Sequence, residues 1–404
     1  MLSRWLHRSY GQTRGAIDAL LGKSAAGEPR RSPSPPEAAT VRTMRVCKVE
    51  REAEDAVILH LEDLEGHPQS YLPGQFVIVT FPIGGRPIQR AYSLCVPPGG
   101  PTTAIAVKRQ PGGTLSPILC EQVHQGDRLR IDGPYGRFTY PPSPPTGGDL
   151  VFFAGGSGIT PIMSILESVL RNETDRRARL LYGNRNQDAI MFRSRLDALA
   201  DTNSSRFTVT YVVDSPSPGW TGGAGRVDAA AAGRFVESLG LGHEAHYYIC
   251  GPEGMIGEVR RALDHRRVPE PRIHVEHFKV PRVEKPEGPT GRACRTVTVR
   301  RQGTLEAFEV DGESTILEAG LAAGVRLPFS CTLGGCGACR VRLASGSVSM
   351  GEPNCLSEQE KQEGYVLACV ARPTGPCVLE VLEHTSSNGR AAAREMAPLL
   401  RASK

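Results

Sequence analysis

The sequence lacks any long hydrophobic run. The longest apolar stretches in its 404 residues are the size of a β-strand, such as Leu150–Ala154, whereas a membrane-spanning helix needs about 20 apolar residues. The first forty residues also lack the apolar core and the small-residue cleavage site of a secretory signal. We therefore expect no membrane span and a cytoplasmic location.

An excess of charge of one sign is also missing. The 48 Lys and Arg residues and 43 Asp and Glu residues leave a formal net charge of only +5, and no basic run is interleaved with aromatic residues. Nucleic acid is therefore not an expected partner. Residues 1–41 are rich in Arg, Ser and Pro, and they are unassigned: a flexible extension, a docking helix and an organelle transit peptide all stay open.

The 11 cysteines are spaced as in a metal protein and not as in a disulfide framework. Cys331, Cys336 and Cys339 follow a C-x4-C-x2-C arrangement, and Cys369 comes after 29 further residues. This is the ligand spacing of a plant-type 2Fe-2S cluster, in which four soft thiolates hold two irons. The sequence therefore predicts that these four cysteines are metal ligands in a reducing compartment.

Three glycines in the same loop have a chemical reason to be there. Gly334, Gly335 and Gly337 would let backbone amides approach the cluster sulfurs without a Cβ in the way. A structural zinc site is the alternative, but zinc sites usually pair two close C-x2-C knuckles. Cys355 and Cys377 fall outside the spacing, and we expect them to be packed or surface thiols.

Changes in hydrophobic periodicity divide the chain into modules. Short alternating segments at 56–61, 75–81, 104–109 and 128–131 indicate a small antiparallel barrel. From residue 150, apolar strands at 150–154, 178–182, 207–213 and 246–250 alternate with helix-sized segments, which indicates parallel βαβ units. The last module contains the four spaced cysteines. We expect a multidomain protein.

Segments rich in Pro, Gly and charge give the expected boundaries. The predicted division is an extension at 1–41, a barrel domain at 42–143, an α/β domain at 148–279, a linker at 280–293, a cysteine-containing domain at 294–384 and a flexible tail at 385–404.

Two short motifs in the barrel module suit a flavin. Arg90 has a planar guanidinium that can pair with a phosphate, Tyr92 can stack on an isoalloxazine ring, and the Ser93 hydroxyl can bond the flavin N5. The sequence GGTLS at 112–116 suits close backbone approach to a pyrophosphate. An edge strand with a satisfied tyrosine is the alternative for the first motif taken alone.

A glycine-rich turn, GGSGITP at 155–161, opens a helix after the strand 150–154. Its N–H groups can cradle a phosphate, although it is not the GxGxxG fingerprint and a plain strand-to-helix turn is the alternative. Cys250-Gly251-Pro252 ends a later strand, where open α/β sheets bind ligands. Arg185 follows another strand and either pairs with the 2′-phosphate of NADPH or is a solvated surface residue.

Taken together, RxYS at 90–93, GGxxS at 112–116, GPYGRF at 133–138 and YLPGQF at 71–76 resemble the ferredoxin-NADP reductase superfamily. Residues 335–348 and 364–373 resemble plant-type ferredoxins. The order flavin, nucleotide, ferredoxin is similar to the one-chain reductase components of bacterial oxygenases and desaturases. The pattern is closest to FAD-containing reductases of the phenylacetyl-CoA epoxidase and 3-ketosteroid hydroxylase type.

The resemblance implies a β-barrel flavin domain, a parallel-sheet nucleotide domain and a β-grasp 2Fe-2S ferredoxin domain. It implies FAD in preference to FMN, NAD(P)H and the cluster as cofactors, and Ser93, Cys250 and Glu276 as catalytic residues. The cofactor-binding residues that it implies are Arg90, Ala91, Tyr92, Ser93, Val107, Lys108, Gly113, Thr114, Leu115, Ser116, Gly155, Gly156, Gly158, Thr160, Pro161, Arg185, Cys250, Gly251, Pro252 and Phe278.

We therefore expect an oxidoreductase that passes electrons from NAD(P)H through FAD and a 2Fe-2S cluster to a partner oxygenase, hydroxylase or desaturase. A second hypothesis is a reductase for a haem protein or another acceptor, which would have the same flavin and nucleotide domains. A redox carrier or sensor without nucleotide turnover is a third hypothesis, and the turn at 155–161 and Cys250-Gly251-Pro252 argue against it. His124, His243, His246, His274 and His277 are scattered in the sequence, and we expect ordinary surface or core roles for them.

Overall fold

The computed structural model describes residues 40–381 apart from gaps at 67–69, 84–85, 141–147, 174, 241–243, 279–293, 302, 326, 330–331, 333, 336 and 353. All contacts discussed below lie within the unit Ala39–Lys404. The predicted linker at 280–293 and tail at 385–404 lie outside the described residues, as does nearly all of the predicted extension at 1–41.

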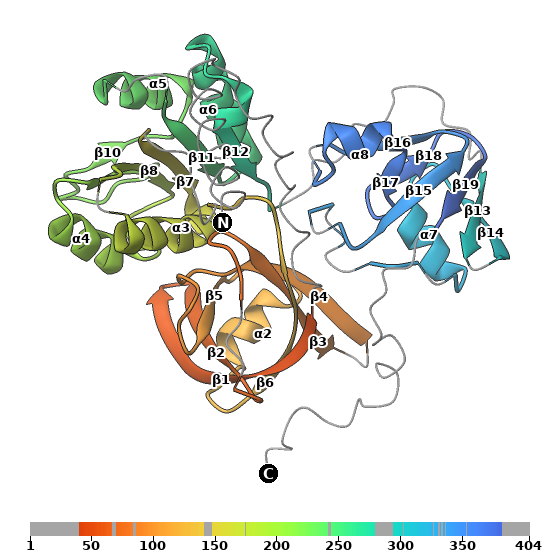
Figure 1. The fold of residues 1–404 in the computed structure, drawn as a ribbon. Coiled ribbons are helices and arrows are strands. Elements are labelled where there is room, and N and C mark those ends of the chain that lie inside the picture. Colours follow the sequence, from red (N-terminus) through yellow and green to blue (C-terminus); the bar gives the residue numbers. More distant parts are fainter. Residues whose placement is uncertain are drawn as a thin grey trace, which may run out of the picture. The chain divides into compact units, whose positions relative to one another are not determined.

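The first module is an antiparallel barrel, as predicted (Figure 1). Its strands occur in the order β4-β3-β6-β1-β2-β5, and an isolated antiparallel bridge between Leu94 and Ile105 joins the two ends of the sheet. The elements are β1 (Thr40–Ala53), β2 (Ala56–Asp63), β3 (Phe76–Ile83), β4 (Arg86–Ser93), β5 (Thr103–Lys108), α2 (Ser116–Glu121) and β6 (Arg128–Tyr135).

The barrel includes a strand that periodicity did not identify. The 14 residues of β1 are rich in Arg, Lys, Glu and Thr, and only Met44 and Val46 in this strand are buried hydrophobic residues. Its central position between β6 and β2 comes from ladder hydrogen bonds on both sides. Because backbone pairing, and not side-chain pattern, holds this strand, a window of hydrophobicity misses it.

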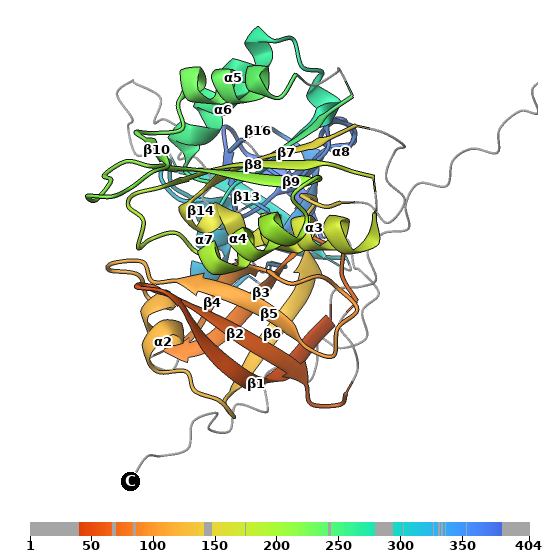
Figure 2. The ribbon, with the colours of Figure 1, turned by 90° about the vertical axis from the view of Figure 1, so that its left-hand side faces the viewer.

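The second module is a parallel sheet in the order β10-β9-β8-β7-β11-β12, which confirms the expected βαβ architecture. Figure 2 shows α3 and α4 on one face of the sheet and α5 and α6 on the other. The elements are β7 (Leu150–Gly155), η1 (Gly156–Gly158), α3 (Ile159–Asn172), β8 (Ala178–Asn184), α4 (Arg193–Thr202), β9 (Phe207–Val213), β10 (Gly223–Ala224), α5 (Ala229–Ser238), β11 (His246–Cys250), α6 (Glu253–His265), η2 (Glu270–Arg272) and β12 (Ile273–Glu276).

The barrel and the parallel sheet share one hydrophobic core. This core contains Ile58 and Ala104 of the barrel, Phe138 after β6, and the buried face of α3. A Cβ on Gly74, whose φ is +94°, would lie 2.1 Å from the Phe138 carbonyl oxygen, so the two segments touch through their backbones. Burial of this apolar surface fixes the barrel against the parallel sheet.

The third module has its own core and a five-stranded sheet in the order β14-β13-β19-β15-β17. Its β13 and β19 are parallel neighbours, the other pairs in this sheet are antiparallel, and α7 belongs to the same core, as expected for a β-grasp. The elements are β13 (Arg295–Arg301), β14 (Thr304–Val310), α7 (Ile316–Ala322), β15 (Arg340–Ser345), β16 (Val348–Met350), α8 (Glu358–Gln362), β17 (Tyr365–Leu367), β18 (Ala371–Pro373) and β19 (Cys377–Glu380). Within the described part of the chain, no helix is long and apolar enough to cross a membrane.

Candidate flavin, nucleotide and cluster sites

The two predicted nucleotide motifs lie at adjacent strand ends. Strand β7 leads into the glycine-rich turn, β11 ends at Cys250, and the two strands pair in parallel with Cys250 opposite Ala154. A Cβ on Gly158 would lie 2.1 Å from the Cys250 carbonyl oxygen, and one on Gly155 would lie 2.6 Å from Pro252 Cδ. The glycines are therefore required for the close packing of these two motifs.

The glycine-rich turn is held by side chains as well as by its own backbone. Gly156 has a φ of +52°, a conformation that favours glycine. The buried Tyr182 hydroxyl donates to the Gly156 carbonyl oxygen at 2.9 Å, and the Thr160 hydroxyl donates to the Ser157 carbonyl oxygen at 3.0 Å. Both Thr160 and Pro161 are buried at the start of α3. The turn is thus shaped before any nucleotide binds.

Cys250 and Glu276 occupy neighbouring positions on β11 and β12. Cys250 is 0% exposed, and burial, with the nearby charges of Glu276 and Glu253, raises the pKa of its thiol well above the ordinary value. The thiol therefore stays protonated at neutral pH and is not a nucleophile. Phe278, also expected in this pocket, is partly buried against the core that contains Cys250.

The flavin motif lies on β4, the terminal strand of the barrel sheet. Successive side chains of a strand point to opposite faces: Tyr92 packs toward the barrel core, whereas Ala91 packs with Phe76 and Tyr135 on the other face. Ser93 pairs with Phe76 of β3 and is 5% exposed. A planar ring could contact both Tyr92 and Ser93 only along the strand edge, and a terminal strand offers such an edge.

The second flavin motif forms a closed turn. The Gly113 amide donates to the Gln110 carbonyl oxygen at 2.9 Å, and the Gln110 amide donates to the Ser116 hydroxyl at 3.0 Å. Leu115 is buried in the barrel core, so of its atoms only the backbone suits a ligand. Ser116 is predicted to contact the cofactor, and its hydroxyl also holds the loop in shape.

A cavity of about 440 Å³ lies between the barrel and Arg185 of the parallel-sheet module. Arg185, at the end of β8, lines it together with Arg109, which follows β5, and Arg51 of β1. Arg109 is held by Glu121 at 2.7 Å, whereas Lys108 is paired with Asp55 at 3.5 Å. The cavity is lined by Arg51, Glu54, Asp55, Arg109, Pro111, Cys120, Glu121 and Arg185.

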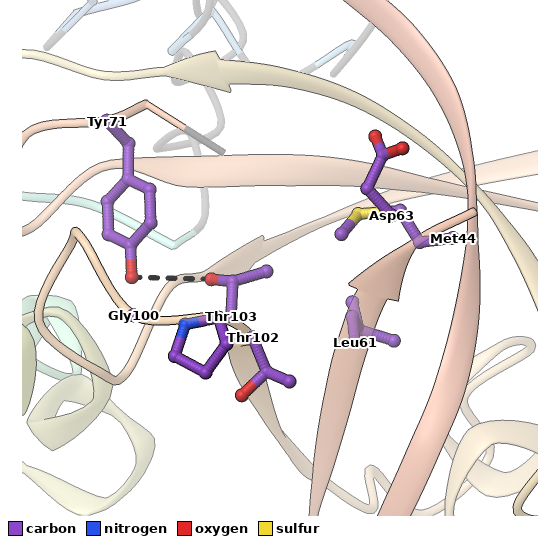
Figure 3. Close-up of a pocket in the computed structure, with 8 residues that line it drawn as sticks. Met44, Leu61, Asp63, Tyr71, Gly100, Thr102 and Thr103 are labelled. Carbon is purple, nitrogen blue, oxygen red and sulfur yellow. Dashed lines mark hydrogen bonds between the residues drawn. The ribbon is translucent and has the colours of Figure 1, made fainter. Parts of the chain in front are cut away.

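A second cavity belongs to the barrel alone. Figure 3 shows it between Met44, Asp63 and the Tyr71–Thr103 hydrogen bond, and its volume is about 10 Å³. This volume is about the minimum that a cavity needs to hold one water molecule. None of the predicted site residues lines this cavity, so we assign it no part in the function.

Two of the four predicted cluster ligands are described. Cys339 and Cys369 are buried, and their sulfur atoms are 3.1 Å apart, which is too far for a disulfide bond of about 2.05 Å. Cys331 and Cys336 lie outside the described residues. Two buried sulfurs that converge without a disulfide are a donor set that fits an iron–sulfur cluster.

In the loop from Cys331 to Cys339, called here the cysteine loop, described residues adopt the positive φ values that glycine allows. Gly334 and Gly337 have φ values of +74° and +73°, and Thr332 adopts +58° without being glycine. A Cβ on Gly334 would lie 3.2 Å from Val370. Cys355, predicted to be outside the ligand set, donates its amide to the Gly334 carbonyl oxygen at 2.9 Å and so supports the loop through its backbone.

The histidines are less scattered in space than in the sequence. His246 and His274 stack with Nδ1 and Nε2 3.2 Å apart, and Tyr248 stacks on His274 with ring centroids 4.4 Å apart. His277 contacts Glu253 at 2.7 Å. Parallel pairing of β11 with β12 places Tyr248 opposite His274 and brings the stacked rings together. The expectation of ordinary surface or core roles for the histidines stays a prediction.

Three family models match successive parts of the chain. They are the oxidoreductase FAD-binding domain over residues 43–140, the oxidoreductase NAD-binding domain over residues 152–261 and the 2Fe-2S iron-sulfur cluster binding domain over residues 299–374. The chain is therefore an oxidoreductase with FAD, NAD and 2Fe-2S domains, and the predicted cofactors are confirmed at this level. The exact predicted domain boundaries stay predictions.

Relatives at more than 30% identity match most of the chain. It is 32% identical to a component of the 1,2-phenylacetyl-CoA epoxidase of Escherichia coli (strain K12), with 83% of this chain and 95% of the relative covered. It is 34% identical to the ferredoxin reductase component of the 3-ketosteroid-9-alpha-monooxygenase of Mycobacterium tuberculosis (strain CDC 1551 / Oshkosh), with 76% and 84% covered.

The solved structure of phthalate dioxygenase reductase, described as a modular structure for electron transfer from pyridine nucleotides to 2Fe-2S, matches with a TM-score of 0.56 and 26% identity over 84% of this chain and 98% of that chain. The chain belongs to the ferredoxin-NADP reductase superfamily, in the family of one-chain reductases with a C-terminal 2Fe-2S domain that includes these relatives.

Proposed function

We propose that this protein is the reductase of an oxygenase system and takes electrons from NAD(P)H for a separate terminal enzyme. The observation that carries this proposal is the presence of FAD-binding, NAD-binding and 2Fe-2S domains, in that order, in one chain. When bound, FAD and the cluster supply the conversion of a two-electron hydride donor into single electrons.

The residues of the chain bind and orient these groups. We assign the flavin to Arg90, Ala91, Tyr92, Ser93, Val107, Lys108, Gly113, Thr114, Leu115 and Ser116. We assign the nicotinamide to the strand ends where Gly158 packs on Cys250, with Glu276 on the neighbouring strand. The Cys250 thiol is protonated and buried, so it contributes shape and not charge beside the nicotinamide. The cluster is assigned to Cys331, Cys336, Cys339 and Cys369.

The nucleotide is proposed to be NADPH in preference to NADH. Arg185 lines the 440 Å³ cavity at the end of β8, together with Arg109 and Arg51. The cavity is also lined by Glu54, Asp55 and Glu121, and Arg109 is paired with Glu121. We therefore assign the 2′-phosphate to Arg185 alone, because a planar guanidinium suits a phosphate better than a free ribose hydroxyl.

The electron acceptor is proposed to be an oxygenase, hydroxylase or desaturase. The relatives named above are components of an epoxidase and of a monooxygenase, which supports this class of partner. We also propose a cytoplasmic location, because the cluster ligands must remain thiolates and a reducing compartment keeps them so.

Anaerobic addition of NADPH to the holoenzyme tests the proposal. We expect the flavin absorbance to bleach first and the cluster absorbance to follow. In Cys336→Ser, flavin bleaching and ferricyanide reduction should persist, while reduction of a cluster-dependent acceptor is lost. Cys294→Ser, which alters an exposed cysteine at the start of the ferredoxin domain, is the matched control. Equal loss of both activities in Cys336→Ser would contradict the modular relay.

A further inference from the structure

We propose that an ion pair between Arg137 of the flavin barrel and Glu360 of the ferredoxin domain is the docking contact that holds the cysteine loop against the flavin module. The Arg137 Nη2 and Glu360 Oε2 atoms are 3.0 Å apart, and 223 positions separate the two residues in sequence. This inference rests on the proposed function, and it makes Arg137 a positioning residue for internal electron transfer.

The Glu360 carboxylate is fixed by its own domain before Arg137 reaches it. It lies in the first turn of α8, where Oε2 accepts from the Ser357 amide at 2.8 Å and the Ser357 hydroxyl at 2.9 Å in a capping box. Arg340, which directly follows Cys339, donates to Oε1 at 2.6 Å and lies over the Tyr365 ring. The carboxylate is therefore linked through one side chain to a cluster ligand.

The Glu360 carboxylate carries a stable negative charge. Burial alone would raise the pKa of Glu360, but hydrogen bonds from Ser357 and the charge of Arg137 outweigh it and lower the pKa to about 2. Glu360 is consequently ionised throughout the physiological range and presents a fixed negative charge to the barrel.

Arg137 differs from Glu360 in being held loosely. Its side chain is 62% exposed, in the segment that follows β6. The preceding Gly136 has a φ of +106° and packs closely on Phe76, since a Cβ there would lie 3.0 Å from the ring. The barrel thus anchors the backbone of this segment and leaves the guanidinium to reach outward.

A second contact lies beside the ion pair. A Cβ on Gly335, within the cysteine loop, would lie 3.8 Å from Phe76 Cζ. Phe76 is the residue that pairs with Ser93 across β3 and β4. The docked arrangement therefore places Gly335, between the predicted ligands Cys331 and Cys336, next to Phe76 of the strand pair to which we assign the flavin N5.

The exposed guanidinium makes the contact weak and sensitive to salt. A weak contact suits a domain whose cluster must also be reached by a separate acceptor. We expect Arg137→Ala to reduce the docked population, and with it the rate of cluster reduction, by about 3- to 10-fold at low ionic strength.

The test is a double-mutant cycle on the holoenzyme with Arg137→Ala and Glu360→Gln. Glutamine at this position preserves the capping box, because its amide oxygen can still accept from Ser357. Stopped-flow absorbance measures cluster reduction after NADPH, and small-angle X-ray scattering of the oxidised protein measures compactness without turnover. Arg128→Ala, an exposed arginine at the start of β6, is the control for loss of a barrel charge.

The proposal predicts that Arg137→Ala slows cluster reduction, expands the protein and flattens the salt dependence, and that it has no further effect in the Glu360→Gln background. Arg137→Lys should recover part of the rate. Additive effects, or an Arg137→Ala variant that behaves like Arg128→Ala, would overturn the docking contact. Failure of both NADPH and NADH to bleach the flavin in the wild-type protein would instead overturn the proposed function.

Discussion

The proposed flavin chemistry depends on the hydroxyl group of Ser93. Ser93 is almost fully buried on a terminal strand of the barrel, directly opposite Phe76. A motif search identifies the residue, and because neighbouring residues of a strand point to opposite faces, Ser93 lies on the opposite face of β4 from Tyr92. The structure adds that the face of Tyr92 is the one turned to the barrel core. The side chains of Tyr92 and Ser93 must therefore contact the flavin from different sides.

We expect Ser93→Ala to slow flavin reduction by NADPH about tenfold, since one hydrogen bond of about 1.4 kcal/mol is lost. Single-turnover stopped flow at saturating NADPH measures this step. Ser93→Thr keeps the hydroxyl and should retain most of the rate. An alanine variant with the wild-type rate would remove Ser93 from the catalytic set.

Arg185 is the residue whose charge should select the nucleotide. We expect Arg185→Gln to raise the KM for NADPH about tenfold and to leave the KM for NADH nearly unchanged, because only the 2′-phosphate needs the guanidinium. Steady-state ferricyanide reduction with both nucleotides measures the ratio. Arg234→Gln, an exposed arginine on α5, is the control. A parallel rise for both nucleotides would argue against phosphate recognition.

At the scale of elements, the nucleotide site is made by two strand ends and the turn between β7 and α3. Strands β7 and β11 coincide with the predicted apolar runs at 150–154 and 246–250 to within one residue, because both faces of a central parallel strand are covered and its residues are largely apolar. The contact of the turn with Cys250 has no sequence signature of its own. It arises because β11 inserts beside β7, on the opposite side of β7 from β8, β9 and β10, the strands that precede it in sequence.

Gly158→Ala tests the close approach of the turn to β11. The new Cβ would lie 2.1 Å from the Cys250 carbonyl oxygen, and backbone cannot move aside cheaply, so we expect a loss of about 1–3 kcal/mol in stability. The thermal unfolding midpoint and the KM for NADPH report the two consequences. Gly257→Ala on α6, where a Cβ meets nothing within 4 Å, should be neutral or stabilising. Equal behaviour of the two variants would show that the turn tolerates separation from β11.

At the scale of the whole molecule, a stack of aromatic rings connects the parallel sheet to the barrel. Phe138, after the last barrel strand, packs edge-on against Tyr248, and Tyr248 stacks on His274. Burial, together with the nearby His246, lowers the pKa of His274 to about 4. The contact between the flavin and nucleotide modules thus includes an imidazole that must stay neutral.

This imidazole predicts a pH dependence of stability. Between pH 6.5, the ordinary pKa, and about 4, the pKa of the folded protein, the unfolded chain takes up a proton at His274 and the folded chain does not. The contribution of His274 is therefore complete above pH 6.5 and is lost as the pH falls toward 4.

Thermal unfolding midpoints, measured at a series of pH values from about 7.5 down to about 4.5, test this effect. We expect His274→Phe, which keeps an aromatic ring in the stack, to flatten the decline at acidic pH. His265→Phe, at the exposed end of α6, is the control for losing an imidazole elsewhere. An unchanged pH profile in His274→Phe would assign the decline to other groups.

The cofactors of the protein could be predicted from local sequence patterns. Cysteine spacing, the RxYS and GGxxS motifs and the switch from alternating to uniformly apolar strands indicate the cluster, the flavin and the nucleotide fold, because each depends on residues that are neighbours along the chain. Which of these motifs come together depends on the tertiary structure: Gly158 packs on Cys250, Arg185 lines one cavity with Arg109, and Arg137 pairs with Glu360. These contacts join residues far apart in the sequence, and their partners depend on strand order and domain packing, which no local pattern records.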